Sequence, residues 1–219
     1  MNRRGLILSV LALGVAGFGG ATWFANRPGP ASVTEAVAPE LAEALIRPYS
    51  PILGPADAPV TIVEFFDPAC EACRAFYPIV KDIMTEHGDA VRVVIRYTPF
   101  HGPISDTSIK LLEAARMQGK FEPVLNALMA YQNAWAAHGA PDLEKIGRIA
   151  AGAGLDLELA MQQIKSPEVV AVFNQDKADV ETMGINQTPT FFVNGKPLDP
   201  FGEAELRRLV AAEVAAAQS

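Results

Sequence analysis

The sequence predicts an α/β protein in which a block of helices is inserted between two groups of strands. β-branched and aromatic residues dominate 60–66 and 91–97, as in buried strands, and helical spacing fills the stretch between them. From 105 to 183 the pattern is helical only. Strand signals return at 189–193, before Asn194-Gly195, a dipeptide that strongly favours a tight hairpin. The order is therefore strand, helix, strand, helices, hairpin, helix.

The N-terminal residues have the features of an export signal. Arg3 and Arg4 precede an uncharged run of 19 residues from Leu6 to Phe24, and positive residues before an apolar run are typical of secretion. The run is also long enough to span a bilayer. A cleaved signal peptide and an uncleaved membrane anchor are therefore equal alternatives for residues 1–25. Both place the rest of the chain outside the cytoplasmic membrane.

Residues 26–50 have the composition of a linker, with a possible short helix over 39–47. Three prolines, at 48, 51 and 55, are expected to interrupt regular structure before the first strand. The domain proper is expected to span 51–219, with the helical insertion over about 103–183. We expect helices over 74–87, 105–118, 121–131, 141–151, 156–165, 167–183 and 202–216, and a return strand of the hairpin over 196–198.

The composition indicates a folded, acidic protein. Half of the residues are hydrophobic, which argues against disorder, and the formal net charge is -7. No dense stripe of lysine and arginine is present to neutralise phosphates, so the sequence argues against a nucleic-acid partner.

The two cysteines form a Cys-x-x-Cys pair, Cys70 and Cys73. A disulfide that closes so short a loop removes little chain entropy, so it would stabilise the fold weakly. Disulfide exchange instead needs an accessible thiolate and a second thiol that resolves the mixed disulfide. At the start of a helix Cys70 would have a lowered pKa. Cys73, one turn further in, would be the thiol that resolves the mixed disulfide.

Two other interpretations of the cysteine pair remain open at this point. One is an inert disulfide. The other is a metal site, for which a structural zinc ion would need about four ligands. The three histidines, His87, His101 and His138, have no ligand-like spacing, and we expect no metal site. The alternative function is a periplasmic protein that handles a soft metal such as copper through the two thiolates.

Two motifs together resemble the DsbA-like branch of the thioredoxin superfamily. They are residues 64–73 (EFFDPACEAC) and 188–195 (TPTFFVNG), and the resemblance extends from about Tyr49 to the C-terminus. It implies a thioredoxin-like fold with an inserted all-helical subdomain. It also implies a periplasmic thiol:disulfide oxidoreductase whose only cofactor is the redox-active disulfide. The expected partners are thiols and disulfides of exported proteins and a membrane redox protein of the DsbB or DsbD type; the direction of electron flow stays open.

The resemblance also implies roles for three residues near the motifs. Pro189 would follow a cis peptide bond and face the disulfide, and the backbone of Thr188 would pair with an extended substrate. Glu64 would be a buried carboxyl that passes a proton to Cys73. The alternative is that Glu64 faces solvent from an edge strand.

The dipeptide between the cysteines, Glu71-Ala72, is expected to tune the pKa of Cys70. It departs from the Pro-His pair of the archetypal oxidase. A negative charge disfavours a neighbouring thiolate, so we expect a more reducing pair than in that archetype. We further expect Asp67 to cap the following helix and His101 to be an ordinary loop histidine.

Overall fold

The computed structural model describes residues 36–137 and 140–219. The predicted signal or anchor over 1–25, and the linker up to residue 35, lie outside the described residues. Within the described ranges, no helix combines the length and the apolar character needed to cross a membrane.

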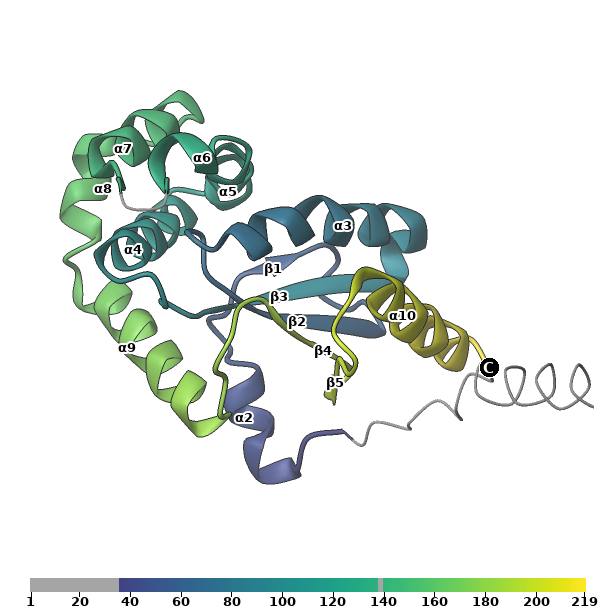
Figure 1. The fold of residues 1–219 in the computed structure, drawn as a ribbon. Helices are drawn as coiled ribbons and strands as arrows, with labels where there is room; N and C mark the ends of the chain where they lie inside the picture. Colours follow the sequence, from purple (N-terminus) through teal and green to yellow (C-terminus); the bar gives the residue numbers. More distant parts are fainter. Residues whose placement is uncertain (1–35, 138–139) are drawn as a thin grey trace, which may run out of the picture. The chain divides into compact units, whose positions relative to one another are not determined.

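A five-stranded sheet forms the centre of the fold, in the order β1-β3-β2-β4-β5 (Figure 1). β2 (Val60–Phe66) pairs in parallel with β3 (Val91–Tyr97) and antiparallel with β4 (Thr190–Val193). β5 (Lys196–Pro197) returns from the predicted hairpin and pairs with β4. Every residue of β2 is buried, as expected for a strand in the middle of a covered sheet.

One strand was not predicted. β1 (Ile52–Leu53) pairs antiparallel with β3, with Ile52 opposite Val94. The expectation that the prolines leave this stretch irregular is wrong because Pro51 needs no backbone N–H there. Its carbonyl oxygen instead accepts a hydrogen bond of 2.9 Å from Ile95 N.

Helices cover both faces of the sheet. The core on one face contains Ile62 and Phe66 of β2 together with buried residues of α3 and α10. The core on the other face contains Val63 and Phe65 with buried residues of α2 and α9. Glu64 lies between Ile62 and Phe66 in the alternation, so it faces α3.

The predicted helical insertion is confirmed between β3 and β4, and its helices α4 to α8 gather beside the N-terminal end of α3 (Figure 1). The helices and 3-10 turns are η1 (Pro39–Leu41), α2 (Ala42–Leu45), α3 (Glu71–His87), η2 (Gly88–Ala90), α4 (Pro103–Met117), α5 (Phe121–Ala130), α6 (Gln132–Trp135), α7 (Leu143–Gly152), α8 (Leu157–Gln163), α9 (Pro167–Thr182) and α10 (Glu203–Ala217).

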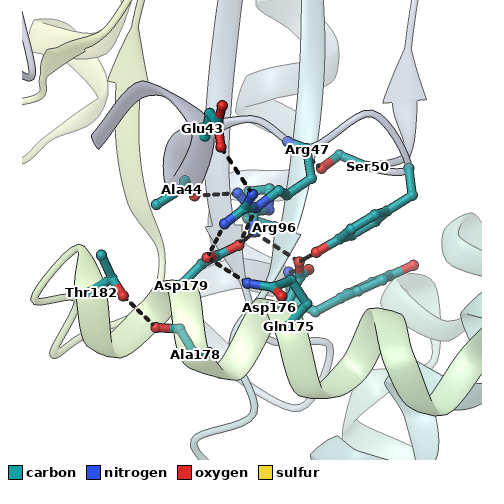
Figure 2. A network of polar contacts seen from close by, with 12 residues as sticks. Glu43, Ala44, Arg47, Ser50, Arg96, Gln175, Asp176, Ala178, Asp179 and Thr182 are labelled. Carbon is teal, nitrogen blue, oxygen red and sulfur yellow. Dashed lines mark hydrogen bonds and ion pairs between the residues drawn. The ribbon is translucent and has the colours of Figure 1, made fainter. Parts of the chain in front are cut away.

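A buried ionic network holds the segment before β1 against the domain (Figure 2). Arg96 of β3 is fully buried and pairs with Asp176 at 2.8 Å and Asp179 at 2.6 Å, both from α9. Arg47 bonds to both carboxylate oxygens of Asp179, at 2.8 and 2.7 Å. Removing one partner of such a buried network leaves an uncompensated charge, which costs about 3–5 kcal/mol. The last residues of the segment expected to be a linker therefore belong to the packed domain.

Candidate active site

The two cysteines lie at the N-terminal end of α3, directly after β2. Cys70 is the residue that precedes the helix, and Cys73 lies in its first turn. Cys73 is fully buried, whereas Cys70 lines a cavity of about 370 Å³. Glu71 and Ala72 are exposed and line the same cavity. Cys70 is itself only 7% exposed, so the pair presents one sulfur at the cavity and keeps the other in the core.

Their surroundings drive the pKa values of the two thiols in opposite directions. The pKa of Cys70 is lowered to about 5, chiefly by a hydrogen bond from Cys73, against the effect of burial. Further lowering comes from the side chain of Thr188 and from backbone N–H groups of Cys73 and Ala72. The pKa of Cys73 is raised well above its ordinary value, first by burial and then by its bond to Cys70. At neutral pH Cys70 is therefore the thiolate and Cys73 the thiol.

Glu64 is a buried, neutral acid beneath the cysteine pair. Its side chain is 1% exposed, and burial, with a smaller contribution from the charge of Cys70, raises its pKa to about 8. Its Oε1 has no hydrogen-bond partner among the described residues. The edge-strand alternative is wrong because β2 is paired on both sides. A carboxyl that keeps its proton at neutral pH can donate it.

The loop before β4 brings a backbone carbonyl to the sulfur of Cys70. The peptide bond between Thr188 and Pro189 is cis, which confirms the expected geometry. Cys70 Sγ lies 3.3 Å from the carbonyl oxygen of Thr188, to which it donates a hydrogen bond when it carries its proton. Pro189 is buried and Thr188 is half-buried. Residues 118 positions apart in sequence therefore meet at the reactive sulfur.

A glutamine from the helical insertion was missed by the sequence analysis. Gln132 of α6 is 1% exposed, and its side-chain Nε2 donates to Pro68 O at 2.7 Å and to Cys70 O at 2.9 Å. It fixes the backbone of the cysteine loop from the side of the insertion. No local sequence signal indicates this, because the contact bridges 62 positions.

Asp67 and His101 form a pair beside the cysteines, and the expectation that Asp67 caps the helix is wrong. Asp67 is fully buried, and Cys70, not Asp67, stands at the N-cap of α3, without a side-chain cap bond. The carboxylate of Asp67 instead accepts hydrogen bonds from Ala69 N at 2.9 Å, Phe100 N at 2.8 Å and the Ser105 hydroxyl at 2.8 Å.

His101 completes this arrangement. Its Nδ1 lies 2.7 Å from Asp67 Oδ2, and the residue lines the same cavity as Cys70. A signal was available: Asp67 follows β2 and His101 follows β3, and parallel neighbours end at the same sheet edge. The backbone N–H of Asp67 lies 3.5 Å from Cys73 Sγ, so Asp67 links His101 to the cysteine pair.

The described residues contain no cluster of three or more histidine, cysteine, aspartate or glutamate side chains able to hold a metal ion.

Comparison with known proteins gives one family and several solved structures. The family model described as thioredoxin matches residues 47–212. A thioredoxin-like oxidoreductase from Silicibacter pomeroyi is 32% identical, with a TM-score of 0.68, over 81% of this chain and 97% of that one. Wolbachia pipientis alpha-DsbA1 has a TM-score of 0.69 at 18% identity, over 80% of this chain and 95% of that one, a likeness of fold.

Relatives among curated proteins are longer than this chain. The Na(+)/H(+) antiporter NhaA of Herminiimonas arsenicoxydans is 36% identical over 149 residues, which are 67% of this chain and 22% of that protein. NhaA 1 of Mycobacterium sp. strain KMS is 34% identical over 77% of this chain and 28% of that protein. The chain thus spans about a quarter of the length of these relatives.

Proposed function

The chain belongs to the thioredoxin family, and its resemblance to the DsbA-like branch is confirmed; on this premise we propose that it exchanges disulfides with exported proteins through Cys70 and Cys73. One observation carries the proposal: Cys70 is ionisable and reaches a cavity, while Cys73 is buried one turn away as a thiol. This division of roles is what a nucleophile and a resolving thiol require.

In the oxidising direction, a substrate thiolate attacks Sγ of Cys70. A substrate–Cys70 disulfide forms as the Cys70–Cys73 bond breaks, and the bonding electrons leave with Cys73. Glu64, neutral below its pKa of about 8, then supplies a proton to Cys73. A second substrate thiolate attacks the mixed disulfide and releases Cys70 as a thiolate. In the reducing direction the same steps run backwards, and neither a metal nor an organic cofactor is required.

The loop that contains Thr188 and Pro189 is the proposed binding site for the substrate backbone. The carbonyl of Thr188 lies next to the reactive sulfur, and an extended peptide pairing with this backbone would bring its cysteine to Cys70. Exported proteins are the proposed clients because of the N-terminal export features, and the proposed redox partner is a membrane protein of the DsbB or DsbD type. The proposed location is the periplasm, either soluble or anchored through residues 1–25.

The test is trapping of the mixed disulfide with a reduced peptide that contains one cysteine. Wild-type protein is expected to transfer its disulfide to a two-cysteine peptide, and Cys70→Ser is expected to be inactive. Oxidised glutathione should load Cys73→Ser at Cys70, and the peptide should then displace glutathione there. Disulfide transfer that persists in Cys70→Ser, or a mixed disulfide that forms at Cys73 in preference to Cys70, would contradict the proposal.

A further inference from the structure

Beside the reactive sulfur lies a histidine that the steps above do not use. Asp67 holds it through one ring nitrogen: Nδ1 of His101 is 2.7 Å from Asp67 Oδ2. The aspartate is itself fixed by three other donors and is fully buried, whereas the side chain of His101 is 39% exposed. The ring is therefore oriented from the buried side and accessible from the other.

The orientation by Asp67 determines which nitrogen is available for chemistry. A carboxylate accepts a hydrogen bond, so Nδ1 carries the proton in the neutral ring and Nε2 keeps its lone pair. Nε2 makes no hydrogen bond to any residue in the described ranges. His101 lines the cavity together with Cys70, which is where a substrate sulfur must arrive to attack. A carboxylate, an imidazole and a reacting sulfur recur in enzymes that activate thiols.

The chemistry has a use for such a base. A substrate thiol is mostly protonated at neutral pH, and only its thiolate attacks a disulfide efficiently. Glu64 and Cys73 lie on the buried side of the reactive sulfur, so they handle the proton of the resolving thiol and not that of the substrate. Proton removal from the substrate needs a group on the cavity side.

We propose that His101, oriented by Asp67, is the base that takes the proton of the incoming substrate thiol. This inference rests on the proposed function. As the substrate sulfur bonds to Cys70 Sγ, its proton passes to Nε2, the Cys70–Cys73 bond breaks, and Cys73 receives the electron pair. In the reverse direction the imidazolium returns the proton to the departing substrate sulfur.

The charged groups around His101 are consistent with this role. Asp67 contacts the ring, and Cys70 and Glu71 line the cavity from α3. The insertion side, as far as it is described, contributes Ala136, Ala137 and Pro141, which carry no ionisable side chain. In the oxidised protein Cys70 is uncharged, so Asp67 and Glu71 are the charged groups that remain around the ring.

The deciding measurement is the pH profile of disulfide transfer from oxidised full-length protein to a reduced two-cysteine peptide. His101→Asn keeps a side-chain donor for Asp67 but removes the base. We expect it to slow transfer about tenfold near pH 7, where the peptide is protonated, and less than about twofold at pH 9.5, where it is already a thiolate. His87→Asn, at the far end of α3, is the matched control and should equal wild type at both values.

Two further measurements separate this role from others. The equilibrium redox potential of His101→Asn should equal that of wild type, and added imidazole should restore the transfer rate of His101→Ala at pH 7. An equal loss at both pH values, a wild-type rate at pH 7, or a shift in potential that accounts for the loss would overturn the proposal. Failure of the proposed function looks different: wild-type protein would then not transfer its disulfide at any pH.

Discussion

Replacing Glu64 by glutamine should make the stability of the protein depend less on pH. In the unfolded chain the carboxyl has its ordinary pKa of 4.5, whereas burial raises it to about 8 in the folded protein. Below pH 4.5 the group is neutral in both states. Between the two values the unfolded chain releases the proton while the folded protein keeps it, so rising pH favours unfolding. Above the folded pKa this loss of stability is complete.

The size of the effect follows from the width of that window. About 3.5 pH units at about 1.36 kcal/mol per unit give about 5 kcal/mol between pH 4 and pH 9. Glutamine cannot lose a proton, so the difference in unfolding free energy between Glu64→Gln and wild type should grow by up to this amount over the same range. Any cost of burying the amide is the same at both pH values and cancels in the comparison.

Urea unfolding of the reduced proteins at pH 4, 7 and 9 measures this difference. Glu181→Gln, at an exposed position near the end of α9, controls for the loss of one surface charge and should show no comparable trend. Glu64→Gln should also slow protonation of Cys73 at neutral pH. This variant is therefore expected to gain stability at pH 9 and to lose disulfide-transfer rate at pH 7. A stability difference that does not change with pH would refute the assignment of a buried, neutral Glu64.

Three other predictions concern the cysteine loop. Alkylation of Cys70 should titrate near pH 5, and Cys73→Ala should move that midpoint upward because the largest stabilising hydrogen bond on the thiolate is lost; an unmoved midpoint would argue against that bond. Glu71→His should make the pair more oxidising, by about 30 mV for each unit by which the pKa of Cys70 falls, measured against glutathione; an unchanged or lower potential would contradict the expected effect of Glu71. Gln132→Leu should lower the unfolding free energy by about 1–3 kcal/mol in urea titration, because it leaves the buried carbonyl oxygen of Pro68 unpaired, whereas that of Cys70 keeps its bond from Arg74 N; wild-type stability would show that these bonds contribute little.

Local patterns were sufficient to predict the sheet and the hairpin. The run over 60–66 is apolar except for Thr61 and Glu64, and it forms the buried central strand. Asn194 and Gly195 adopt φ angles of 47° and 79°, the left-handed backbone that the dipeptide favours and that most residues avoid. These features depend on residues close together in sequence, so composition and spacing reveal them.

The parts that sequence reasoning missed depend on contacts between distant residues. β1 has only two residues, and its pairing with β3, not its own propensity, makes it a strand. His101 gains its surroundings from Asp67, 34 positions earlier, once two parallel strands end side by side. The orientation of Glu64 depends on which alternating face of β2 packs against α3. The residue type alone does not decide this.

The redox potential of the cysteine pair depends on which influence on Cys70 is stronger. The charge of Glu71 is expected to disfavour the thiolate, but this side chain is exposed, where solvent and salt weaken a charge. The groups that lower the pKa of Cys70 to about 5 are instead held in place: Cys73 in the core, Thr188 beside Pro189, and the first backbone N–H groups of α3. A stabilised thiolate favours the reduced pair. Because that pKa lies between about 7 for thioredoxin and about 3.5 for DsbA, the disulfide should be a stronger oxidant than thioredoxin and a weaker one than DsbA.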